Sequence, residues 1–177
     1  MSKVLAIDTS TSRSCVAIIE GANVLYSGFR DGATAHGPSL PALVQEALGV
    51  SDVDEVVVGM GPGPFTGLRV GIAFAQSFAL AREIPVRGVC SLDAIAAQVT
   101  DKDFIITVDA RRKEFYWARY THGVRVGQPA VNFPADVTGA TIHADLFPDM
   151  VALVNLPGTI TEPIYLRRPD AVATVDR

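Results

Sequence analysis

The stretch from Val56 to Gly71 most constrains how this chain can fold. Three consecutive valines, Val56–Val58, have no polar residue between them, which indicates a short strand buried on both faces and favours a parallel sheet. The Gly-Pro-Gly-Pro segment at 61–64 follows, and it leaves the backbone little freedom because proline fixes φ. The sequence then predicts a helix from Thr66, a residue suited to the N-cap, to about Glu83. A strand, a rigid turn and a helix therefore follow one another without a flexible linker.

This helix is apolar nearly all round, so it should be buried nearly all round. Small residues recur along it every four positions, and this stripe allows another element to approach closely. Two interpretations remain open. Either the helix is enclosed within its own domain, or one of its faces meets the sheet while another meets a second protein. The stripe consists of Gly67, Gly71, Ala75 and Ala79.

A second feature is an internal repeat. The segment Phe104–Asp109 matches Lys3–Asp8 at an offset of 101 residues (109 − 8), and Phe115–Tyr120 matches Ser14–Ile19 at the same offset. A strand, an aspartate, a polar turn and another strand thus occur twice, which indicates a duplicated α/β fold. We expect a first lobe over residues 1–100 and a second over 101–177. The second lobe should be truncated, because helical periodicity is nearly absent after its third strand.

Composition narrows the classes of function. The chain has 177 residues, a formal net charge of −4, and no apolar run long enough to cross a bilayer. Its N-terminus lacks the apolar region of a signal peptide, and its two cysteines suit a reduced compartment, so we expect a cytoplasmic protein. The acidity argues against a stand-alone nucleic-acid-binding module. The three histidines and two cysteines have no spacing typical of a metal site.

Two sets of polar residues are candidates for chemistry. Asp8 and Asp109 end equivalent strands, so they predict either a nucleotide cleft between the lobes or two aspartates that cap turns with their side chains, and we favour the caps. The basic run Arg111–Lys113 is typical of a solvated turn, and its functional alternative is contact with RNA phosphate or an acidic partner. The segment at 61–67 is a poor phosphate loop, since its prolines lack N–H donors.

Four segments together resemble the TsaB family of bacterial tRNA threonylcarbamoyladenosine biosynthesis subunits. They are Ala6–Ser10, Gly59–Gly71, Val108–Arg111 and Tyr165–Arg167. The family motif turn is the most specific of them. Its residues here are Gly61, Pro62, Gly63, Phe65, Thr66 and Gly67.

The resemblance implies a fold like that of actin, sugar kinases and heat-shock ATPases, with a shortened second lobe. It implies a non-catalytic subunit that dimerises with the catalytic paralogue TsaD, in a complex that modifies adenosine beside the anticodon of tRNAs reading A-starting codons. The ATPase TsaE joins this complex, and tRNA is met through it. No cofactor or metal is expected in this chain, because ATP and a partner-bound metal serve the complex. Alone, the chain should form a homodimer, and no membrane is involved.

The resemblance also implies which helices pair with the partner, here Ser39–Leu48 and Thr66–Leu80. An alternative function is a small ATP-dependent phosphotransferase of the same superfamily, which would use Asp8 and Asp109. The predicted partner-binding residues are Ser39, Leu40, Leu43, Val44, Ala47, Leu48, Thr66, Arg69, Val70, Ala73, Phe74 and Ser77.

Overall fold

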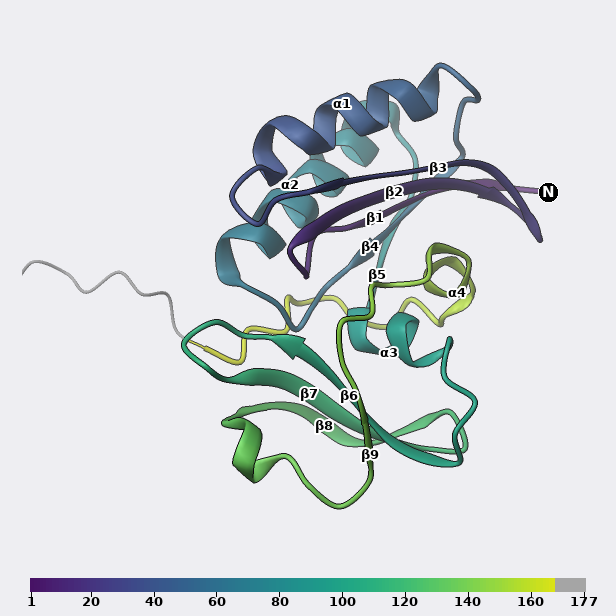
Figure 1. Cartoon of the computed structure of the whole chain (residues 1–177). Coiled ribbons are helices and arrows are strands. Elements are labelled where there is room, and N and C mark those ends of the chain that lie inside the picture. Colours follow the sequence, from purple (N-terminus) through teal and green to yellow (C-terminus); the bar gives the residue numbers. More distant parts are fainter. Residues whose placement is uncertain (168–177) are drawn as a thin grey trace, which may run out of the picture.

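The first lobe is a five-stranded sheet with helices on both faces (Figure 1). A computed structural model of the chain describes residues 1–167. The strands lie in the order β3-β2-β1-β4-β5. β1 pairs antiparallel with β2 and parallel with β4, and β4 is also parallel to β5. Their bounds are β1 Lys3–Asp8, β2 Arg13–Glu20, β3 Asn23–Asp31, β4 Glu55–Gly59 and β5 Val86–Val89.

The predicted strand and helix around the motif turn are confirmed. Val56–Val58 in β4 are buried between two parallel neighbours, as the unbroken valine run indicates. Helix α2 runs Phe65–Arg82. Its N-cap is Pro64, with ψ of 131°, rather than Thr66, and no side chain caps it, because the rigid turn itself directs the chain into the helix.

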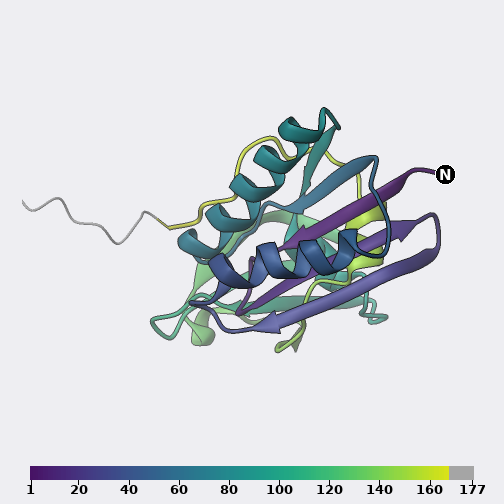
Figure 2. The same cartoon turned by 90° about the horizontal axis from the view of Figure 1, so that it is seen from above.

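Helices cover both faces of this sheet. Residues of β1 that point one way, Leu5 and Ile7, pack under α1 (His36–Leu48) and α2, which both lie over this face of the sheet (Figure 2). Residues that point the other way, Val4 and Ala6, pack on α3 (Ser91–Ala96) and α4 (Met150–Asn155). The strand alternation therefore separates two cores, one on each side of the sheet.

The second sheet repeats the first, as the internal similarity predicts. Its order β8-β7-β6-β9 reproduces β3-β2-β1-β4, with β9 parallel to β6. The register corrects one detail. Asp8 lies opposite Cys15, whereas Asp109 lies opposite Phe115, so the offset of the second strand is 100 residues (115 − 15) and the second turn is one residue shorter. The bounds are β6 Asp103–Asp109, β7 Phe115–Thr121, β8 Val124–Asn132 and β9 Thr141–His143.

Helix α3 lies between the two sheets and belongs to both cores. Leu92 and Ile95 pack against the second sheet, while Ala94 packs against the first. Figure 1 shows α3 enclosed between the two layers. The lobes are therefore joined by a shared apolar core.

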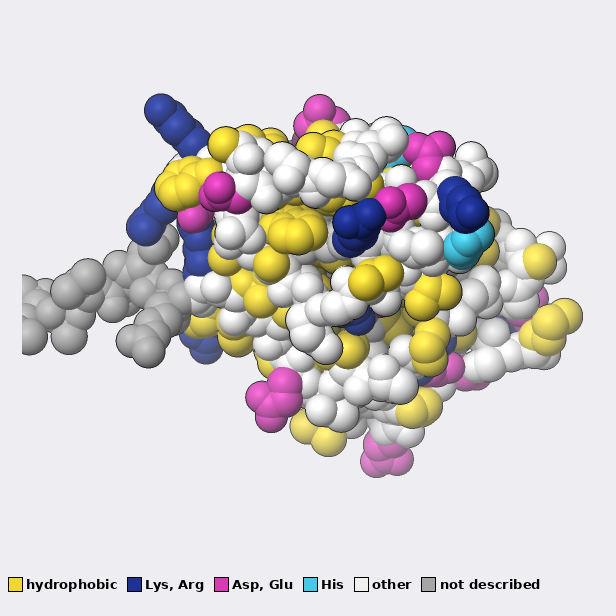
Figure 3. Space-filling model, turned by 90° about the horizontal axis from the view of Figure 1, so that it is seen from below, with side chains coloured by type: hydrophobic (Ala, Val, Ile, Leu, Met, Phe, Trp, Pro, Cys, Tyr) yellow, Lys and Arg dark blue, Asp and Glu magenta, His cyan; other side chains and the backbone are white. Residues whose placement is uncertain are grey.

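The second lobe is thin. The single turn η1 (Pro134–Asp136) lies where the first lobe has α1, between the third and fourth strands of the repeat. Val124 pairs with Thr121, and Ile142 pairs with Ile105. These pairings place the exposed side chains of Val124 and Ile142 on the face of the second sheet that is turned away from α3. Figure 3 looks at this side of the molecule, where hydrophobic side chains reach the surface. In residues 1–167 no helix has the length and apolar character needed to span a membrane.

Helix α4 follows the second sheet in the chain but packs on the first. Its Leu153 is buried beside Val4 and Ala6. Arg87 of β5 donates to the carbonyl oxygen of Leu156 at 2.7 Å and to that of Val154, so it holds the C-terminal end of α4. The predicted second lobe, 101–177, thus contributes a helix to the other sheet, and its residues 168–177 lie outside the described part.

Replacing Leu153 by alanine should test whether α4 packs on the first sheet. Loss of a fully buried leucine costs about 2–5 kcal/mol of unfolding free energy, because Leu153 is 0% exposed in the core under the first sheet. The matched control is Leu80→Ala, since Leu80 is 81% exposed on α2. Urea unfolding followed by circular dichroism measures both. Equal stability of the two variants would contradict the position of α4.

Candidate functional site

A buried polar cluster lies where β1 ends, beneath the start of α2. Asp8 is fully buried and accepts three hydrogen bonds. The backbone N–H and hydroxyl of Ser10 donate to Oδ1 at 2.8 and 2.7 Å, and the Ser91 hydroxyl donates to Oδ2 at 2.6 Å. Burial raises the pKa of Asp8, and these hydrogen bonds oppose that rise. Asp8 is therefore enclosed by its own chain and offers no open carboxylate.

Asp109 at the equivalent strand end is exposed instead. Its Oδ1 accepts the backbone N–H of Arg111 at 2.8 Å, and its Oδ2 lies 4.0 Å from the Arg111 guanidinium. Each aspartate thus accepts a backbone N–H two residues ahead, which is the turn-capping role favoured from the sequence. The structure does not bring the two carboxylates to one cleft.

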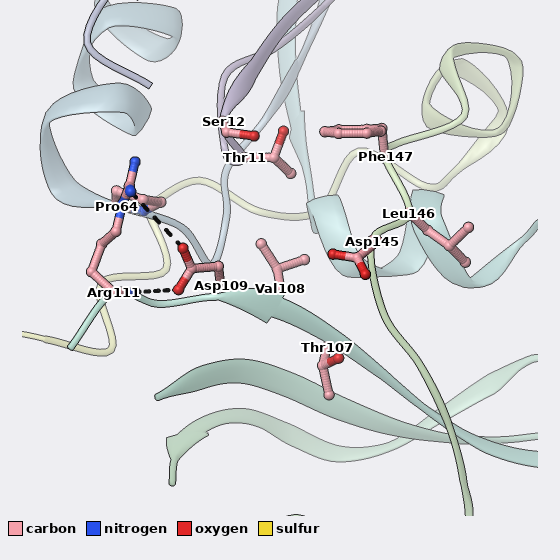
Figure 4. Close-up of a pocket in the computed structure, with 10 residues that line it drawn as sticks. All are labelled: Thr11, Ser12, Pro64, Thr107, Val108, Asp109, Arg111, Asp145, Leu146 and Phe147. Carbon is pink, nitrogen blue, oxygen red and sulfur yellow. Dashed lines mark hydrogen bonds and ion pairs between the residues drawn. The ribbon is translucent and has the colours of Figure 1, made fainter. Parts of the chain in front are cut away.

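A cavity of about 90 Å³ lies between the lobes (Figure 4). Thr11, Ser12 and Pro64 line it from the first lobe, and Asp109 faces it from the second. Pockets for drug-sized ligands measure about 300–1,000 Å³, so this hollow is too small to enclose a nucleotide. The phosphotransferase alternative gains no support here, because it needs Asp8 and Asp109 around one nucleotide. Among the residues described, no cluster of His, Cys, Asp and Glu side chains could hold a metal ion.

The motif turn packs against the turn that follows β1. A Cβ added to Gly63 would lie 2.4 Å from the carbonyl oxygen of Ser10, so no side chain fits there. The Gly61 N–H donates to the Ser91 hydroxyl at 3.2 Å. Ser91, the first residue of α3, therefore bridges Asp8 and the motif turn, and Cys90 takes the N-cap position of α3.

The small-residue stripe of α2 faces its own domain. A Cβ on Gly71 would lie 2.2 Å from Oγ1 of Thr9, and that hydroxyl donates to the Gly67 carbonyl at 2.7 Å. His36, the first residue of α1, is buried beside Gly67 and hydrogen-bonds Ser14 at 2.8 Å. Burial lowers the pKa of His36. The stripe is therefore the side of α2 that packs against the rest of the first lobe, and the opposite side of the helix faces outward.

The predicted partner-binding residues divide between the two helices. Those of α1 belong mostly to the core of this chain, which corrects the prediction. Their i, i+3, i+4 spacing marks a buried face, but it does not show which protein buries it. Leu40, Leu43, Val44 and Ala47 are at most 3% exposed, while Ser39 and Leu48 are half-buried.

The predicted residues of α2 lie at the surface. Thr66, Arg69, Ala73 and Ser77 are exposed, and Val70 and Phe74 are half-buried. Leu80 extends the same side of the helix and is 81% exposed, so it is a residue that the prediction missed. Its signal was present, since it follows Ala73 by seven residues. We call this surface the α2 face, made of Thr66, Arg69, Val70, Ala73, Phe74, Ser77 and Leu80.

Comparison with known proteins identifies relatives over most of the chain. Residues 31–158 match the family model TsaD, described as tRNA N6-adenosine threonylcarbamoyltransferase. An uncharacterized protein of Mycobacterium tuberculosis is 45% identical over 201 aligned positions, which cover 97% of this chain and 94% of the relative. Because the alignment is longer than the 177 residues of this chain, the relative contains residues that the chain lacks.

Relatives with more specific names match as well. The Escherichia coli tRNA threonylcarbamoyladenosine biosynthesis protein TsaB is 35% identical over 127 positions, covering 67% of this chain and 54% of TsaB. Among solved structures, a Pseudomonas aeruginosa protein described as similar to the peptidase YeaZ aligns with a TM-score of 0.78 at 26% identity, covering 94% of this chain and all of that one. YeaZ from the same organism gives 0.72 at 28% identity, with 87% and 89% coverage.

Two glycine substitutions should distinguish the close packing of α2 against the first lobe from the effect of helix propensity. Alanine favours a helix over glycine by about 1 kcal/mol, yet Gly71→Ala should destabilise the chain by about 1–3 kcal/mol because overpacking displaces Thr9. The control is Gly37→Ala in α1, where a Cβ meets nothing within 4 Å, and it should leave stability unchanged or raise it. Thermal and urea unfolding report both. A stabilising Gly71→Ala would disprove the close contact.

Proposed function

Because the chain belongs to the TsaB family, we propose that it is a non-catalytic subunit in tRNA threonylcarbamoyladenosine biosynthesis. In this proposal the modified base is the adenosine beside the anticodon of tRNAs that read A-starting codons. Its Asp8 is buried and its Asp109 caps a turn, so neither carboxylate is arranged for catalysis around a ligand. The chain would act by holding a catalytic subunit in its competent form.

The α2 face is the single observation that carries this role. It joins an exposed leucine and an exposed alanine to two half-buried apolar side chains on one rigid helix. Phe74 also stacks with Phe78, with ring centroids 6.1 Å apart, so the surface is ordered before any partner arrives. Exposed apolar surface on a helix typically marks a protein-binding site.

The partner that fits is the catalytic paralogue TsaD, through helix-to-helix packing against α2. Since most predicted residues of α1 are buried, α1 contributes Ser39 and Leu48 at the margin of the contact. TsaE would join the pair, tRNA would be met through the complex, and ATP and a metal would be bound by the other subunits. In the cytoplasm without its partner, the chain would pair with itself through the same face.

An omission assay tests the proposal. Threonine, bicarbonate, ATP and tRNA are supplied to TsaD, TsaE and the enzyme that makes the threonylcarbamoyl donor, with and without this chain. Modification should require the chain, and Asp109→Asn should support it as well as the wild type does, because the amide oxygen can still accept the Arg111 N–H. Mass spectrometry of the nucleosides measures the product. Equal modification without the chain would disprove the role, and loss of modification with Asp109→Asn would point to catalysis in this chain.

A charge on the α2 face should weaken pairing. Val70→Glu or Ala73→Glu buries an unpaired carboxylate at the contact, which should lower affinity for the partner at least about tenfold. The matched control is Ala135→Glu on η1, an exposed position in the second lobe. Sedimentation velocity titrations measure the affinity, and circular dichroism verifies folding. Unchanged pairing of a folded Ala73→Glu variant would exclude the α2 face.

A further inference from the structure

The turn between β6 and β7 has an unusual backbone. Three consecutive basic residues, Arg111, Arg112 and Lys113, have φ of 62°, 54° and 63°. The left-handed region costs a residue other than glycine roughly 1–2 kcal/mol, and such conformations concentrate at functional sites. The structure thus displays three exposed cations in a conformation that their sequence alone disfavours.

Short contacts hold this basic turn, defined as Arg111, Arg112 and Lys113, in place. The Ala110 N–H donates to the Glu114 carbonyl at 2.9 Å, and the Glu114 N–H donates to the Arg111 carbonyl at 3.0 Å. Asp109 accepts the Arg111 N–H from below. The side chains therefore project from a closed loop, and ordering them for a ligand costs little backbone entropy.

The C-terminal segment anchors the turn to the first lobe. Arg167 donates to the Ala110 carbonyl at 3.0 Å and forms an ion pair with Glu114. Two residues earlier, the ring of Tyr165 packs on Phe65 at the start of α2, with centroids 4.8 Å apart. The Arg69 guanidinium lies 5.2 Å from the same Phe65 ring.

Cations and an exposed ring thus gather at one end of the molecule. Figure 3 shows Lys and Arg side chains collected at its left-hand end, where the β6–β7 turn lies in Figure 1. Tyr165 is 39% exposed there. Because the whole chain has a net charge of −4, this positive region is local, and a polyanion would approach the molecule in one orientation.

We propose that the basic turn binds the phosphate backbone of tRNA while the chain acts in the modification complex. The inference rests on the proposed function and names a contact that this subunit makes itself. Arginine pairs with phosphate oxygens through two parallel hydrogen bonds, and lysine adds a point charge. Contacts of this kind position an RNA without reading its sequence.

An acidic protein is the competing partner, and the composition of the turn disfavours it. The centre of a protein interface is apolar and depleted in charged residues; arginine is enriched in such interfaces, but lysine is depleted. The turn exposes only charged side chains between the buried Ala110 and the half-buried Glu114. Protein interfaces with nucleic acid are more polar and much more positively charged than those with another protein. Phosphate is therefore the better match.

The test compares two double variants with the same loss of charge. Arg111→Gln/Lys113→Gln removes two cations of the turn. The control Arg82→Gln/Lys102→Gln removes two exposed cations, one at the last residue of α2 and one directly before β6. The tRNA affinity of the reconstituted complex is measured by filter binding from 50 to 200 mM salt. The turn variant should bind about tenfold more weakly at 0.1 M salt, with a salt slope smaller by about 1.4–1.8 for two lost phosphate contacts. The control should match the wild type.

Partner affinity is measured in parallel by sedimentation, so that a failure of the tRNA-binding inference can be distinguished from a failure of the proposed subunit role. Wild-type tRNA affinity and slope in the turn variant would overturn this inference while leaving the subunit role intact. Weaker pairing with unchanged tRNA binding would also overturn it, because the turn would then contact protein. If wild-type chain and partner form no complex, the subunit role fails. In that case the tRNA affinity of the isolated wild-type chain is compared with that of the isolated turn variant in the same assay. If neither binds tRNA, or if both bind it with equal affinity, the inference is overturned as well.

Discussion

The buried carboxylate of Asp8 is the contact on which the arrangement of the first lobe depends. A carboxyl group enclosed by protein must have its hydrogen-bonding capacity satisfied, and here Ser10 donates to it from the turn after β1 and Ser91 donates to it from α3. Ser91 in turn receives the Gly61 N–H, so one hydroxyl fixes both the start of α3 and the motif turn. Since α3 is packed between the two sheets, the position of the second lobe follows from the same polar cluster.

The sequence predicts the strands and the repeat well because their signals are local. The run Val56–Val58 and the matching segments around Asp8 and Asp109 specify buried strands through residue type alone. The shorter second turn escapes such reasoning, since a one-residue difference in a polar loop leaves the apolar pattern on either side intact. The sheet against which helix α4 packs escapes it too, because six residues carry too little periodicity to indicate which sheet they cover.

The candidate site was predictable only in part, for a physical reason. Periodicity identifies the buried face of a helix but not the molecule that buries it, so Leu43 of α1 and Ala73 of α2 looked alike in the sequence. The difference between them is geometric. The glycines of α2 let Thr9 and α1 approach one side of that helix closely, which leaves Ala73 on the other side without cover from this chain.

The packing of α4 on the first sheet has a consequence for how the chain folds during its synthesis. A ribosome delivers the first sheet and its helices α1 and α2 long before residue 150, and N-terminal regions generally begin to fold during synthesis. The part of the far side of that sheet that α4 covers, where Leu153 is buried, nevertheless stays uncovered until the second sheet has also been translated. The first lobe of this chain therefore cannot mature on its own ahead of the second, and a nascent chain stalled before α4 would display β-sheet surface that a chaperone must protect.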